Sequence, residues 1–151
     1  MSKRVVRRYK DTSAKGDSSK IEGNRHFIRV DLVSLKMEER TEIGLRSEIF
    51  FRTGKTKLKR GTRSPSNGSI YIEKNEVFKP AGGLNLYSEF IDQEDGDVVI
   101  NFQIFENDVG KDDEILETKL NIKIGQNKDY LSFSENGAKI KIAVSGKKTR
   151  F

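Results

Sequence analysis

The sequence predicts an all-β protein, in which one antiparallel β-sandwich of about eight strands follows a basic N-terminal arm. Three observations support this fold class. Four segments alternate apolar and polar residues with the period of a half-buried strand. Turn-forming residues separate these segments from each other and from shorter apolar runs. The one window with helical character, residues 33–46, has poor apolar spacing and is expected to be a loop.

Residues 1–24 are expected to form a disordered basic arm, and residues 25–151 a single sandwich domain. The arm is polar, contains Gly16, Gly23 and several serines, and shows no apolar periodicity. Within residues 1–20, seven Lys/Arg outnumber two Asp, which gives the arm a charge of +5.

The four long strands are predicted from the residues that face the core. These are Ile28, Val30 and Leu32; Val98, Ile100, Phe102 and Ile104; Leu116, Leu120, Ile122 and Ile124; and Ile140, Ile142 and Val144. Shorter strands are expected at 46–53, 69–73, 76–79, 86–91 and 129–134. Turn formers such as Pro80-Ala81-Gly82-Gly83 and Asn136-Gly137 lie between them.

Composition excludes several classes of protein and of site. The chain of 151 residues has no cysteine, so it has no disulfide framework, thiolate nucleophile or cysteine zinc site. No run of about 18 apolar residues is present, and no hydrophobic segment follows the basic N-terminus as in a signal peptide. The expected location is therefore the cytoplasm or the surface of a membrane.

Basic and acidic residues are segregated along the chain. Residues 51–63 hold six Lys/Arg and no acid, whereas residues 89–117 hold eleven Asp/Glu and only Lys111 as a cation. Opposite parts of the fold are therefore expected to meet different partners.

The basic segment contains Gly54-Lys55-Thr56, which resembles the end of a nucleotide-binding loop. Such a loop needs a glycine five residues earlier, where this chain has Ile49, and a helix afterwards. The alternative is a hairpin that binds a polyanion by charge, through Lys55, Lys57, Lys59, Arg60 and Arg63. A charged hairpin edge that only prevents aggregation fits the same residues.

The sequence gives little support to catalysis. His26 is the one histidine, it begins a predicted strand, and no Gly-x-Ser-x-Gly elbow accompanies it. We therefore expect no enzyme activity.

The acidic segment predicts a loop in which carboxylates gather between two strands. Its members are Glu106, Asp108, Asp112 and Asp113. Several oxygen ligands in one loop suit Ca²⁺, although the spacing differs from that of an EF-hand. An acidic turn that serves only solubility is the alternative.

Residues 26–145 resemble a C2 domain in three stretches. HFIRVDLVSLK resembles the first strand, GLRSEIFF the opening of the second, and FENDVGKDDEILETKLNIKIG the strand, acidic loop and strand near the end. The resemblance implies Ca²⁺ ligands in the loops, with Glu48 in place of an aspartate, and a lysine-rich lipid-binding patch at the cationic hairpin. The first loop departs from the family pattern because it offers Glu38, Glu39 and Glu42 rather than aspartates.

These features predict a non-enzymatic module that docks on anionic lipid headgroups or on a protein partner, with modulation by Ca²⁺. The alternative is a capsid-type or nucleic-acid-binding sandwich whose arm neutralises RNA or DNA through Arg4, Arg7 and Arg8. A third hypothesis is a homo-oligomer formed through complementary acidic and basic faces.

Overall fold

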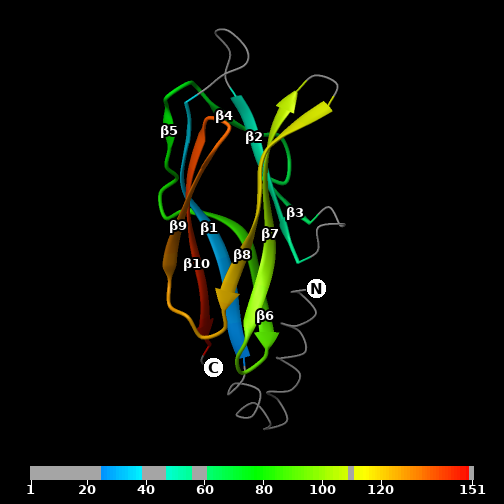
Figure 1. Ribbon diagram of the computed structural model, residues 1–151, viewed down its shortest axis with the longest axis vertical. Helices are drawn as coiled ribbons and strands as arrows, with labels where there is room; N and C mark the ends of the chain where they lie inside the picture. Colours follow the sequence, from blue (N-terminus) through cyan, green and yellow to red (C-terminus); the bar gives the residue numbers. More distant parts are fainter. Residues whose placement is uncertain (1–24, 39–46, 56–60, 109–110, 150–151) are drawn as a thin grey trace.

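A computed structural model of the chain describes residues 25–38, 47–55, 61–108 and 111–149. These residues form two antiparallel five-stranded sheets that pack face to face (Figure 1). The strands are β1 (Arg25–Met37), β2 (Ser47–Gly54), β3 (Thr62–Ser64), β4 (Ile70–Ile72), β5 (Val77–Phe78), β6 (Leu84–Asp92), β7 (Asp97–Asp108), β8 (Lys111–Lys123), β9 (Asp129–Glu135) and β10 (Ala138–Lys148). The predicted antiparallel β-sandwich is confirmed.

Sheet A contains β5, β6, β1, β10 and β9. Strand β1 lies at its centre and pairs with β10 on one side, while β6 and β5 share its other side. Strand β9 pairs with β10 at the opposite edge. Sheet B is arranged in the same way: β2 pairs with β7, β3 and β4 share its other side, and β8 forms the far edge beside β7.

The core lies between the two sheets and contains the residues that the alternation predicted. All fourteen predicted inward side chains are at most 9% exposed. Apolar side chains of both sheets form one cluster, in which the rings of Phe51 and Phe102 stack at 6.0 Å. A polar contact also joins the layers, because the Thr53 hydroxyl donates to the carbonyl of Leu86 at 2.7 Å. Burial of alternate residues therefore holds each strand with one face inward.

The predicted loop over residues 33–46 is wrong in its first part, because β1 continues to Met37. The register with β10 shifts between Leu32 and Ser34, which makes Val33 the extra residue of a bulge. After the bulge, Leu35 and Met37 point into the core. An irregular spacing in the sequence thus reflects a bulged strand. Residues 39–46 lie outside the described part of the chain.

The arm predicted at residues 1–24 also lies outside the described residues. Over the ranges that the structure describes, no helix is long and apolar enough to cross a membrane.

Candidate anion-docking face

The acidic residues predicted to share a loop lie instead on a continuous hairpin of β7 and β8. Glu106 pairs with Asp113, Asn107 with Asp112, and Asp108 with Lys111. The loop prediction is therefore wrong. The apolar alternation ends near residue 105, but backbone pairing continues to the tip of the hairpin because it needs no apolar side chains.

The hairpin does not gather the predicted metal ligands. Glu106 lies opposite the buried Ile49, so its side of the ladder faces inward, and Asp113 shares that side. Glu48 directly precedes Ile49, and Asp112 directly precedes Asp113. Because successive side chains of a strand alternate between its two sides, Glu48 and Asp112 face outward. Among the described residues, no three Asp, Glu, His or Cys side chains form a group that could hold a metal ion. The side chain of Asp108 lies outside that description. The Ca²⁺ site therefore remains a prediction.

Lys55 of the predicted polyanion site is engaged within the protein. Its Nζ lies 2.9 Å from Oε1 of Glu89, which is 8% exposed and lies in β6 of the other sheet. The Tyr87 hydroxyl donates to the same carboxylate at 2.6 Å. Burial, together with the hydrogen bond to Glu89 and its charge, raises the pKa of Tyr87. Because a buried carboxylate requires a counter-ion, Lys55 serves the fold at this position.

Arg63 is likewise committed to local structure. Its Nη1 donates to the carbonyls of Pro65 and Gly68, both at 2.7 Å. Its guanidinium lies 4.0 Å from the centre of the Phe50 ring, and that ring also stacks on Phe105 at 5.2 Å. Arg63 therefore covers an aromatic pair on the outer side of sheet B. The other predicted polyanion-binding residues lie outside the described part of the chain: Lys57, Lys59, Arg60, Arg4, Arg7 and Arg8.

A different set of cations gathers on the outer side of sheet A. We call this surface the basic face and define it by six residues: Arg29, Lys36, Lys128, Lys139, Lys141 and Lys147. The bulge at Val33 keeps Arg29 before it and Lys36 after it on the same side of β1. Lysines 139, 141 and 147 alternate with buried residues of β10 and therefore point outward together.

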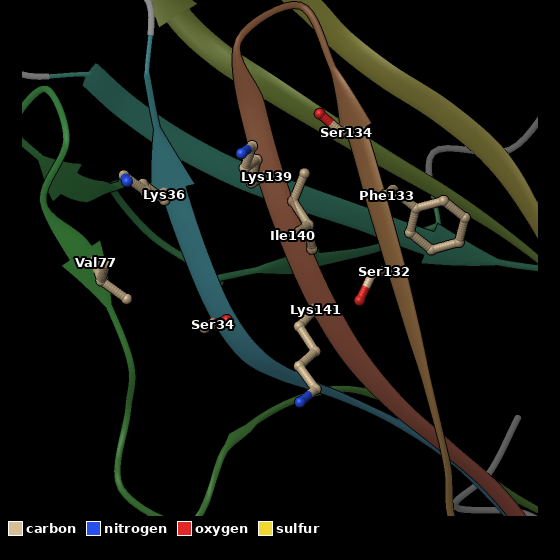
Figure 2. A pocket seen from close by; sticks show the side chains of 9 residues that line it. All are labelled: Ser34, Lys36, Val77, Ser132, Phe133, Ser134, Lys139, Ile140 and Lys141. Carbon is tan, nitrogen blue, oxygen red and sulfur yellow. The ribbon is translucent and has the colours of Figure 1, made fainter.

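Strand register arranges part of the basic face as two rows. Lys36 pairs with Lys139, which pairs with Ser134; Ser34 pairs with Lys141, which pairs with Ser132. The six side chains surround a shallow pocket of about 380 Å³, as Figure 2 shows. Val77 also lines the pocket from the outer side; Phe133 and Ile140 contribute to the lining, but their side chains point toward the core. Three ammonium groups and three hydroxyls, all hydrogen-bond donors, thus border the pocket.

Two like charges stand directly opposite each other in the first row, an arrangement that destabilises a sheet unless it is compensated. Glu38 provides one compensating charge: its Oε2 lies 3.5 Å from Lys36 Nζ and 3.3 Å from Lys139 Nζ. The hydrogen bond from Lys139, with the charges of both lysines, lowers the pKa of Glu38. The single carboxylate of Glu38 contacts two ammonium groups, and Lys141 lines the same pocket as a third cation. This part of the face therefore keeps a positive net charge.

The other half of the basic face surrounds a second hollow, which contains Arg29, Lys128 and Lys147. Asp31 is its carboxylate and pairs with Arg29 at 2.8 Å. The basic face thus has six cations and two carboxylates that contact them, Asp31 and Glu38. Its net charge is therefore +4.

Sequence reasoning missed the basic face because its cations are distant in the chain. The available signal was the alternation in AKIKIAVSGKK, whose lysines occupy the outward positions of a predicted strand. Alternation alone does not reveal that this strand pairs with the one that carries Lys36 and Ser34.

Comparisons with known proteins agree with this architecture. The sequence matches no protein-family model and no curated protein. A solved structure described as a C2 domain has a TM-score of 0.52 and 13% identity, over 81% of this chain and 98% of that one. A C2 domain of plant extended synaptotagmin 1 has a TM-score of 0.52 and 12% identity, over 83% of this chain and 97% of that one.

Human GIVD cytosolic phospholipase A2 is similar to this chain over a small part of its own length. The TM-score is 0.56 with 11% identity, over 83% of this chain and 17% of the phospholipase. At these identities the similarity concerns the fold alone. The chain has a C2-like β-sandwich, as the sequence predicted.

Proposed function

We propose that this chain is a non-enzymatic binding module that docks on membranes rich in anionic lipid headgroups, and that the basic face is its docking surface. The observation that carries the proposal is the two-row arrangement of Lys36, Lys139 and Lys141 with three serines around one pocket. Ammonium groups and hydroxyls are suitable donors to phosphate and carboxylate oxygens of lipid headgroups. The C2-like fold supplies a rigid sheet that holds these donors on one side.

The charge of the basic face suffices for reversible docking. A cation near an anionic membrane surface contributes about 1 kcal/mol, so a net charge of +4 corresponds to about 4 kcal/mol, or roughly a thousandfold preference over a neutral membrane. Screening by salt shortens the reach of these charges to about 8 Å at physiological ionic strength. Docking should therefore weaken steeply as salt is added.

Two exposed apolar side chains border the basic face and suit an interfacial position. Tyr130 on β9 is 52% exposed and Val77 on β5 is 54% exposed, at opposite edges of sheet A. The Tyr130 ring also lies 5.1 Å from Lys141 Nζ. Tyrosine prefers the headgroup region of a bilayer, because its ring is apolar and its hydroxyl is polar.

Cosedimentation with vesicles tests the proposal. The purified chain is mixed with phosphatidylcholine vesicles that contain either no anionic lipid or a large fraction of phosphatidylserine. The variant Lys139→Gln/Lys141→Gln removes two charges from the basic face. The matched control Lys119→Gln/Lys123→Gln removes two exposed lysines from β8 in sheet B.

We expect the wild-type chain and the control to bind the anionic vesicles with similar affinity. The basic-face variant should bind roughly thirtyfold more weakly, which corresponds to about 2 kcal/mol for two cations. Equal weakening of both variants would mean that net charge alone drives binding, and no binding by the wild type would refute the proposal. A third variant, Lys57→Gln/Lys59→Gln, tests the hairpin that the sequence predicted as the polyanion site.

A further inference from the structure

Strands β8 and β9 each form one edge of their sheet, and these two edges differ in how they are protected. Strand β8 carries charged residues along its length and is interrupted by a bulge beside Ile115. The Asn136 side chain donates to the Ile115 carbonyl at 2.7 Å, so one acceptor of that edge is already satisfied. Charges, bulges and capped carbonyls are the usual means by which proteins prevent a further strand from adding to an edge.

Strand β9 has none of these protections over its central residues. Tyr130–Ser134 reads YLSFS, without charge or proline, and its register with β10 is regular from Ala138 to Val144. No described strand other than β10 pairs with β9. Within the described ranges, a cap is found only at the start of the edge, where the Asp129 carboxylate accepts the N–H of Tyr130 at 2.9 Å. The backbone from Leu131 to Ser134 is therefore suited to pairing with another strand.

The side chains beside this edge indicate what an added strand would carry. Leu131 and Phe133 point toward the core but are only partly buried, so apolar residues on the inner side of an added strand would cover them. In Figure 2, Phe133 lies on the side of β9 that faces away from Lys139 and Lys141. Ser132 and Ser134 pair with these two lysines on the outer side, and adjacent strands lie about 4.8 Å apart. Outward carboxylates of an added strand could reach the lysines across two small serine side chains.

We infer that the free edge of β9 binds an extended acidic peptide as an additional strand of sheet A, with acidic residues outward and apolar residues inward. Main-chain hydrogen bonds would supply affinity, and the alternating side chains would supply selectivity. This inference does not depend on membrane docking, because it concerns the backbone edge of β9 and requires no lipid.

The experiment uses the ¹⁵N-labelled full chain and a synthetic ten-residue probe of alternating Glu and Val, blocked at both ends. Two further probes carry the same sequence, with backbone N-methyl groups on either all the Glu or all the Val residues. An extended strand directs alternate N–H groups to opposite edges, so methylation removes the donors of one edge only. A Lys–Val probe of equal length tests the requirement for acidic side chains.

The unmethylated Glu–Val probe should shift the amide resonances of Leu131–Ser134 and slow their hydrogen exchange. One N-methylated probe should bind at least about tenfold more weakly than the other, because it loses bonds to β9. The Lys–Val probe should leave these resonances unchanged.

Two results would overturn the inference. Equal binding by both N-methylated probes would show attraction by charge without strand pairing. Protection of the β9 amides that rises with protein concentration alone, together with a dimer in light scattering, would show that a second copy occupies the edge. Loss of vesicle binding has no bearing on any of these readouts, so the two proposals can fail separately.

Discussion

The substitution Arg63→Lys tests whether Arg63 stabilises the fold or binds anions, as the sequence suggested. Arg63→Lys keeps the positive charge, but its side chain is one atom shorter and lacks the planar group that covers the ring while its terminal nitrogen reaches both carbonyls. The guanidinium makes two hydrogen bonds of 2.7 Å, to Pro65 and Gly68, and covers the Phe50 ring at 4.0 Å.

The expected loss of stability follows from these contacts. A hydrogen bond from a charged donor contributes about 1.5 kcal/mol at the low end of its range, which suits a half-buried side chain, and the contact with the ring adds about 0.5 kcal/mol. Arg63→Lys should therefore lower the free energy of unfolding by about 3.5 kcal/mol. For a domain of this size, that corresponds to a fall in Tm of roughly 7–14 °C.

Urea denaturation and calorimetry measure this loss, and vesicle cosedimentation of the same variant provides the second readout. Arg52→Lys is the matched control, because Arg52 lies farther from the same ring, at 5.6 Å. Arg63→Lys should be destabilised while its vesicle binding stays within about twofold of the wild type, since the charge is retained. A variant as stable as the wild type would refute the structural role.

Three further predictions concern the basic face, the packing of the sheets and metal binding. Glu38→Gln should bind anionic vesicles about fivefold more tightly at pH 7, because it removes a carboxylate from the docking surface. The pKa of Glu38 is lowered from its ordinary value of 4.5, so the difference should persist until the pH falls below that value; weaker binding by the variant would contradict the assigned surface. Gly146→Ala should cost about 2 kcal/mol in urea denaturation, because an added Cβ would lie 2.8 Å from the Lys123 carbonyl oxygen of the other sheet; unchanged stability would mean that the two sheets separate easily there. Millimolar Ca²⁺ should raise Tm no more than Mg²⁺ does, since the carboxylates of the β7–β8 hairpin divide between its two sides; a rise of several degrees with Ca²⁺ alone would instead support the predicted metal site.

The sequence predicted those features that depend on the residues of a single strand, namely the position of the strand and its buried face. Alternation identified the buried face of every long strand, because burial selects residues two apart in the chain. It failed at Val33, where a bulge shifts that period by one residue, and at the β7–β8 tip, where pairing continues without apolar side chains. Both errors arise because backbone hydrogen bonds form independently of the side-chain pattern.

The candidate site was less predictable, because it depends on which strands become neighbours. Lys36 and Lys139 are separated by more than one hundred residues, yet they are direct partners in the β1–β10 ladder. The run of cations at 51–63 was conspicuous in the sequence, but its described members are Arg52, Lys55 and Arg63, and the last two neutralise or cover groups within the protein. Local charge density in the sequence therefore did not point to the basic face, and the polyanion site at 51–63 stays a prediction. The hypotheses of a nucleic-acid-binding arm, a calcium site and a charge-paired oligomer remain predictions.

The distribution of charge between the two sheets also constrains how the module would approach a membrane. The basic face belongs to sheet A, whereas the paired acidic residues of the β7–β8 hairpin belong to sheet B. An anionic surface would attract the basic face and repel the acidic β7–β8 hairpin, so the molecule would turn sheet A toward the membrane before any contact forms. Tyr130 and Val77 would then reach the headgroup region, because both are exposed at the margins of sheet A.

Fluorescence quenching by headgroup-labelled lipid tests this orientation. A tryptophan placed at Tyr130 should be quenched more than a tryptophan placed at Tyr71, which lies on β4 of sheet B and is similarly exposed at 51%. Equal quenching at both positions would mean that the module docks without a fixed orientation, and the basic face would then lose its special role.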